Sequence, residues 1–129
     1  AMVAAQGGDL RAIDDPSRLP SVPGRATIDA PRAGIVERVD AEAIGRASMV
    51  LGAGRSRAGD AIDPAVGLRV LARPGAAVSR GEALAELHHR DGFGLDPARA
   101  LAASAFVIGD EAPEPAPLIL GHVRAPAAC

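Results

Sequence analysis

The stretch VGLRVLARPGAAVSRGEALAELH, residues 66–88, decides the fold because it holds three strand patterns separated by two turn signals. Apolar and polar residues alternate in its first part, as they do in a half-buried strand. Pro74-Gly75 and Arg80-Gly81-Glu82 are combinations typical of turns. The expected strands cover residues 66–72, 76–78 and 83–88.

Upstream of this stretch the pattern changes from strand to helix. Short strands are expected over 27–30 and 35–39. Asp40 then stands where a carboxylate can accept from the free N–H groups of a first helical turn. Apolar residues recur at helical spacing over 41–51, and Gly52 is the expected stop.

Downstream, Asp96 and Pro97 predict the cap and first residue of a helix over 97–104. Further strands are expected over 106–108 and 118–120. Short strands with frequent turns and two helices indicate an α+β domain whose strands are mostly antiparallel.

The chain divides into three parts by composition. Residues 1–25 are expected to hold the end of a helix from a preceding domain, closed by Gly7-Gly8, and a proline-rich linker. The folded domain is expected over 26–123, and 124–129 form a tail.

Composition excludes several classes of function. Aromatic residues make up 2% of the 129 residues, so stacking platforms for single-stranded nucleic acid are lacking. The net charge of -2 gives no attraction to nucleic acid or an anionic membrane. There is no Lys, and Cys129 is the one Cys, so neither a lysine-bound cofactor nor a disulfide framework is expected. We expect a cytoplasmic protein without a membrane span.

The glycine-rich segment 52–60 is the strongest candidate for a functional loop. Its glycines fit neither a dinucleotide fingerprint nor a P-loop, because Asp60 occupies the position of the phosphate-binding lysine. Two interpretations stay open. Either the segment is a mobile loop whose Arg55 and Arg57 contact another part of the protein, or it is an ordinary solvated loop.

Other reactive side chains lack the partners that chemistry needs. His88 and His89 are adjacent on an expected strand, so they point to opposite faces and do not share a metal. His122 and Cys129 have no evident partner. No serine lies in a nucleophile elbow, and Glu82 and Glu86 are better read as surface carboxylates. The sequence therefore predicts no catalytic, cofactor-binding or metal-binding residue.

Two families share motifs with the chain. Residues 30–36 and the hairpin 74–84 resemble the biotinyl and lipoyl carrier domains. Those carriers bind their cofactor on a lysine, so the absence of Lys excludes carrier function, although a related barrel-sandwich fold is implied. The stronger resemblance is to the C-terminal domain of thymidine phosphorylase and pyrimidine-nucleoside phosphorylase. It is carried in order by Val3–Asp9, Leu51–Asp60 with Ile62-Asp63 and Val66-Gly67, and Gly75–Leu87, with Asp110–Pro113 resembling the closing segment.

The phosphorylase resemblance implies an α/β-hammerhead domain attached to a large α/β domain and a small helical domain. The whole enzyme would be a homodimeric transferase that uses phosphate as co-substrate and releases the free base and a (deoxy)ribose 1-phosphate. Its base- and phosphate-binding motifs belong to the first two domains and do not occur in this sequence. The resemblance therefore implies an accessory domain that packs on the rest of its polypeptide and supports closure. The alternative is a stand-alone binding or scaffold module with a biotinyl-like fold.

Overall fold

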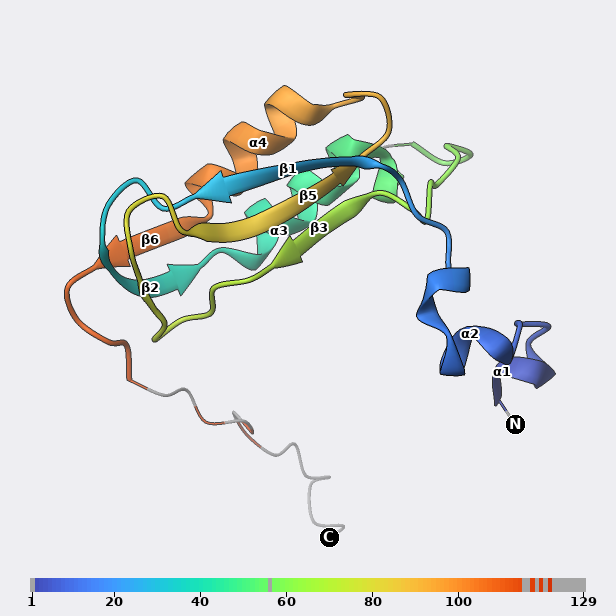
Figure 1. The fold of residues 1–129 in the computed structure, drawn as a ribbon, viewed down its shortest axis with the longest axis horizontal. Coiled ribbons are helices and arrows are strands. Elements are labelled where there is room, and N and C mark those ends of the chain that lie inside the picture. Colours follow the sequence, from blue (N-terminus) through green and yellow to red (C-terminus); the bar gives the residue numbers. More distant parts are fainter. Residues whose placement is uncertain (1, 56, 115–116, 118, 120, 122–129) are drawn as a thin grey trace, which may run out of the picture.

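The computed structural model describes residues 2–55, 57–114, 117, 119 and 121, which form two antiparallel sheets and a small number of helices (Figure 1). The expected mixture of helices with mostly antiparallel short strands is confirmed. One sheet has the strand order β1 (Gly24–Asp29), β5 (Ala83–His89), β3 (Gly67–Val70). The other has the order β4 (Ala77–Val78), β2 (Gly34–Val39), β6 (Phe106–Gly109).

Helices α3 (Ala41–Ser48) and α4 (Leu95–Ser104) lie together on one face of the β1-β5-β3 sheet (Figure 1). The π-helical turn η2 (Met49–Ala53) continues α3. Three short elements precede β1 and contain no buried residue: α1 (Met2–Ala5), α2 (Arg11–Asp14) and the 3-10 helix η1 (Pro16–Arg18). The strand expected at 118–120 lies outside the described residues.

The main core lies between the helices and the β1-β5-β3 sheet. Alanines of α3 and α4, such as Ala47, Ala98 and Ala102, are fully buried there and allow the helices to approach the sheet closely. Leu87 of β5 and Leu51 of η2 supply the larger side chains. The buried apolar residues are all Ala, Val, Leu or Ile, as the shortage of aromatics predicts.

A second, smaller cluster joins the two sheets. Its buried members are Ala30, Val36, Ala72, Val78 and Leu84. The β1–β5 pairing shifts register between Ile28 and Asp29, opposite Leu84. Successive side chains of a strand point to opposite faces. Leu84 therefore faces this cluster, while Ala85 and Leu87 face the main core.

The structure corrects the expected start of the second helix. α4 begins at Leu95, two residues before the expected position, and its N-cap is Gly94 with a φ of 63° and no side-chain hydrogen bond. Asp96 is not the cap but lies in the first turn, where a carboxylate still favours the helix dipole. A Cβ on Gly94 would collide with the carbonyl oxygen of Val50, so packing against η2 sets this boundary.

The N-terminal segment shows the expected glycine stop. Gly8 N–H donates to Val3 O and Gly7 N–H donates to Ala4 O, while Gly7 has a φ of 76°. These two bonds form the Schellman pattern that ends a helix. Val22 is buried in the main core and β1 begins at Gly24, so packing starts a few residues before position 26.

Candidate functional site

The candidate site is built around the end of α3, where the chain leaves the core and enters the glycine-rich loop. Asp40 caps the start of this helix, with its Oδ1 accepting from Glu42 N at 2.9 Å and from Ala43 N at 3.1 Å. At the other end Gly52 has a φ of 102°, which a residue with a side chain adopts only with strain. The predicted cap and stop are both confirmed.

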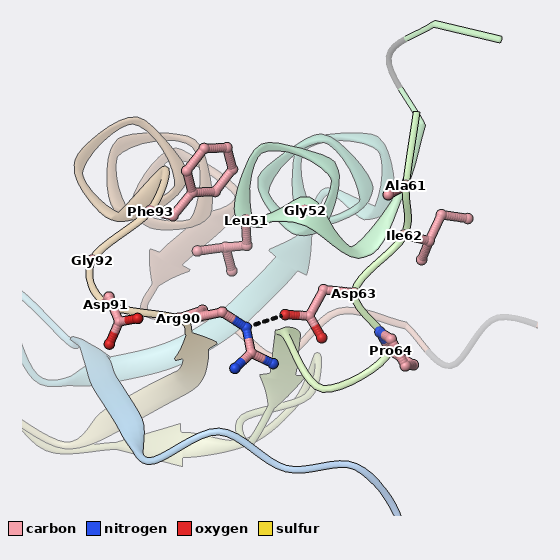
Figure 2. Close-up of a pocket in the computed structure, with 10 residues that line it drawn as sticks. All are labelled: Leu51, Gly52, Ala61, Ile62, Asp63, Pro64, Arg90, Asp91, Gly92 and Phe93. Carbon is pink, nitrogen blue, oxygen red and sulfur yellow. Dashed lines mark hydrogen bonds and ion pairs between the residues drawn. The ribbon is translucent and has the colours of Figure 1, made fainter. Parts of the chain in front are cut away.

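Asp63 holds the base of this loop together through three contacts. Its N–H donates to Gly52 O at 3.0 Å, so the first and last residues of the loop are joined. Its Oδ1 accepts from Ala65 N at 3.0 Å, and its Oδ2 accepts from Arg90 Nε at 2.6 Å (Figure 2). The two ends of the loop between positions 52 and 63 are therefore held together by these contacts.

The Asp63–Arg90 pair is ionised at neutral pH. The Arg90 guanidinium, followed by the Ala65 N–H, holds the pKa of Asp63 below its usual range. Asp63 in turn raises the pKa of Arg90. The Asp63 and Arg90 side chains are 27% and 55% exposed, so solvent weakens the attraction between them. The pair therefore positions the loop more than it stabilises the fold.

Arg55 and Arg57 lie on the exposed part of the loop. The Arg57 backbone N–H donates to Asp60 Oδ2 at 2.7 Å, and Asp60 N–H donates to Arg57 O at 3.2 Å, which makes a tight turn at the tip. Within the described part of the chain, neither guanidinium forms a hydrogen bond or an ion pair. Both interpretations of the loop, mobile contact and solvated surface, stay predictions.

An open, mostly apolar groove of about 740 Å³ lies beside the base of the loop (Figure 2). Leu51, Gly52, Ile62 and Phe93 line it, and the Asp63–Arg90 pair lies along it. Phe93 is 67% exposed, and its ring lies 3.9 Å from the place where a Gly52 Cβ would be. The groove thus combines an exposed aromatic ring with one charged pair.

The two adjacent histidines have different local partners. His88 Nε2 lies 2.6 Å from Glu86 Oε1, which also accepts from Arg25 Nη1 at 2.6 Å. His88 first, and Arg25 second, hold the pKa of Glu86 below its usual range. His89 Nδ1 instead accepts from Gly92 N at 3.1 Å. These contacts tie neighbouring strands and turns together.

The remaining candidates are structural or fall outside the described residues. Glu82 Oε2 accepts from Ser79 N at 2.8 Å, which caps the turn before β5. Ser104 Oγ donates to Leu101 O at 2.8 Å. His122 and Cys129 lie outside the described residues. No group of three His, Cys, Asp or Glu able to hold a metal occurs in the described ranges. Over the same ranges, no helix is long and apolar enough to cross a bilayer.

Sequence reasoning missed the Asp63–Arg90 pair and the exposed position of Phe93. The paired residues are 27 positions apart, so no local pattern reports their contact. Asp63 before Pro64 is nevertheless a turn signal, and a carboxylate at the start of a turn is a candidate for binding backbone N–H groups.

Comparison with known proteins matches the chain to one domain family and to several longer relatives. The profile of the family described as "Pyrimidine nucleoside phosphorylase C-terminal domain" matches residues 35–109. A thymidine phosphorylase of Burkholderia orbicola (strain MC0-3) is 40% identical over 115 residues, which are 88% of this chain and 26% of that protein.

Two further relatives give the same result. A thymidine phosphorylase of Mycobacterium tuberculosis (strain CDC 1551 / Oshkosh) is 38% identical over 122 residues, or 95% of this chain and 27% of the relative. A pyrimidine-nucleoside phosphorylase of Geobacillus stearothermophilus is 43% identical over 86 residues, or 67% of this chain and 20% of the relative. The chain thus spans about a quarter of the length of the relatives it matches.

Proposed function

This chain belongs to the family of pyrimidine nucleoside phosphorylase C-terminal domains, and from that premise we propose that it is the accessory domain of a larger phosphorylase. The observation that carries the proposal is the asymmetry of the match. A relative aligns with 88% of this chain, yet the aligned part is 26% of the relative. The parent polypeptide would then supply the nucleoside- and phosphate-binding residues, and this domain would add packing and closure.

The proposed parent reaction joins a pyrimidine nucleoside and phosphate to give the free base and a (deoxy)ribose 1-phosphate. Phosphate is a co-substrate of the parent, and the domain itself binds no cofactor. Its partners would be the other domains of the same polypeptide, in a homodimeric cytoplasmic enzyme. The two sheets and their helical layer are compatible with an α/β-hammerhead arrangement related to barrel-sandwich folds. The proposed boundaries remain 1–25, 26–123 and 124–129.

The glycine- and arginine-rich loop is the segment best suited to act on the rest of the enzyme. Arg55 and Arg57 present planar guanidinium groups that can donate in pairs to a carboxylate. The loop base is fixed by Asp63, while glycines within the loop allow the tip to change conformation. Closure of the neighbouring domain onto these two arginines would therefore need movement of the tip alone.

The test is the double variant Arg55→Ala plus Arg57→Ala in the full parent polypeptide. We expect a lower kcat for nucleoside phosphorolysis and an unchanged thermal unfolding midpoint, since both residues are exposed. Arg73→Ala plus Arg80→Ala is the matched control, because these two exposed arginines lie in turns at the opposite end of the domain (Figure 1). Kinetics that are unchanged by the loop variant would reject the closure role.

The alternative of a stand-alone binding or scaffold module is not favoured. Each of the relatives named above is a phosphorylase several times longer than the aligned region.

A further inference from the structure

Several exposed apolar side chains belong to segments that lie at one end of the domain. The N-terminal segment, the loop between η2 and β3, and the turn between β5 and α4 all lie at this end (Figure 1). They carry a set of large apolar residues that remain exposed: Met2, Leu10, Ile13, Leu19, Ile62 and Phe93. Within this set, Ile62 and Phe93 also line the apolar groove, and exposed apolar side chains around a hollow are candidates for an interface.

Phe93 and Ile62 are the exposed apolar residues of the groove itself. They are 67% and 46% exposed and stand on the groove whose floor includes buried Leu51 (Figure 2). An aromatic side chain beside an apolar hollow has the character of an interface anchor. Gly52 also lines the groove, and a Cβ at this position would lie 3.9 Å from the Phe93 ring.

Arg90 adds a polar anchor next to the apolar ones. Its Nε is held by Asp63, which fixes the plane of the guanidinium. Among the described residues, its terminal nitrogens Nη1 and Nη2 have no hydrogen-bond partner. A guanidinium fixed in this way can bind a carboxylate or backbone carbonyl groups of an incoming chain.

We infer that the Phe93–Ile62–Arg90 groove is the docking seat for the preceding part of the same parent polypeptide. This inference rests on the proposed function and specifies its partner surface. The occupant would insert an apolar side chain between Phe93 and Ile62 and present an acceptor oxygen to Arg90. Two observations favour this occupant over a second copy of the chain. About three quarters of the relatives' length lies outside the matched region, and the segment that precedes the domain enters at the same end as the groove (Figure 1).

Hydrogen–deuterium exchange of the full parent polypeptide, compared with this chain alone, tests the inference. We expect the amides of residues 61–63 and 91–94 to exchange at least about tenfold more slowly in the parent. Phe93→Glu in the parent should raise their exchange to the rate of the isolated chain. Phe93→Leu should preserve the protection, and Leu71→Glu, at a residue 42% exposed outside the groove, should not change it.

Three results would overturn the inference. The first is equal exchange of the groove in the parent and in the isolated chain. The second is full protection in the Phe93→Glu parent. The third is protection of the isolated chain that increases with its concentration, since that would identify a second copy as the occupant. If Phe93→Glu were to unfold the domain, the parental comparison would still decide the matter, because it needs no variant. Phosphorolysis by the parent is a separate measurement, so its absence would reject the proposed function without changing the exchange result.

Discussion

Asp63 Oδ2 lies 2.6 Å from Arg90 Nε, and this contact joins the base of the glycine-rich loop to the turn that follows β5. The same aspartate binds Gly52 O through its N–H and Ala65 N through its Oδ1. Asp63 therefore connects three places in the fold: η2, the segment just before β3 and the turn just after β5. The loop that carries Arg55 and Arg57 and the groove that carries Phe93 share this support.

We expect substitution of Asp63 to loosen the loop in two steps. Asp63→Asn keeps an acceptor for the Ala65 N–H but loses the charge that binds Arg90. Asp63→Ala loses both contacts. The rate of hydrogen exchange over residues 53–62 should thus increase from the unsubstituted chain to Asp63→Asn and again to Asp63→Ala. Asp9→Asn is the control, because Asp9 pairs with Arg11 inside the N-terminal segment. Equal exchange in all four proteins would show that Asp63 does not support the loop.

The same pair predicts a pH dependence with a definite sign. Because Arg90 and the Ala65 N–H hold the folded pKa of Asp63 below its unfolded value, ionised Asp63 favours the folded state. Its contribution is present above the unfolded pKa of about 3.9 and is lost as the pH falls through the lower folded value. The difference in unfolding free energy between the unsubstituted chain and Asp63→Asn should therefore shrink as the pH falls from 6 to 2.

Urea unfolding at a series of pH values measures this difference. Comparing the two proteins is necessary because Glu86 also has a lowered pKa, so its contribution to the stability is lost on acidification as well. That contribution is common to both proteins and cancels in the difference. The prediction would be contradicted if the unfolding free energy of the unsubstituted chain minus that of Asp63→Asn stayed constant or grew on acidification.

Substitution by alanine should change the stability of the domain in opposite directions at Gly45 of α3 and Gly52 of η2. Gly52 has a φ of 102°, and a Cβ there would meet only Val66 and Phe93 at ordinary contact distances, so strain of the backbone decides the outcome. We expect Gly52→Ala to destabilise the domain by about 1–2 kcal/mol. Gly45 lies within α3 with nothing near its missing Cβ. Gly45→Ala should stabilise by about 0.5–1 kcal/mol.

Urea unfolding of the two single variants compares these effects. Similar stabilities for Gly45→Ala and Gly52→Ala would contradict the left-handed conformation at the end of η2.

The alanine-rich core makes its few large side chains important. Leu87 is fully buried at the centre of the β1-β5-β3 sheet, between strands and helices. Leu87→Ala should lower the free energy of unfolding by about 2–5 kcal/mol, because small neighbours have little side chain to fill the cavity. Leu71→Ala, at an exposed leucine, should change it by less than about 1 kcal/mol. Comparable losses for the two variants would contradict the assigned core.

Local signals in the sequence predicted the elements well, and non-local contacts caused the errors. The start of α3 depends on Asp40 and the end of its continuation η2 depends on Gly52, and both residues act on neighbouring backbone. The start of α4 depends on Gly94 packing against Val50, 44 residues away. The local Asp96-Pro97 signal therefore predicted a cap at Asp96 and a first helical residue at Pro97, although both residues lie inside the first turn. Alternation predicted the strand at 66–72, and the turn signals at Pro74-Gly75 and Arg80-Gly81-Glu82 bounded the two strands that follow it.

The candidate site was predicted only in part for the same reason. Arg55 and Arg57 stand out within one short segment, so the sequence alone proposes them as contact residues, and this role stays a prediction. The groove needs Phe93 and Arg90 to lie against residues 51–64, and no spacing in the sequence reports that contact. The register shift opposite Leu84 likewise arises from pairing between strands that are distant in the sequence.

The most direct measurement of the central claim compares phosphorolysis of thymidine and uridine by the full parent polypeptide and by this chain alone, each supplied with phosphate. The account predicts that the parent releases free base and (deoxy)ribose 1-phosphate, while the isolated, folded chain releases neither. Release of base by the isolated chain, or a folded parent that cleaves no pyrimidine nucleoside, would contradict it.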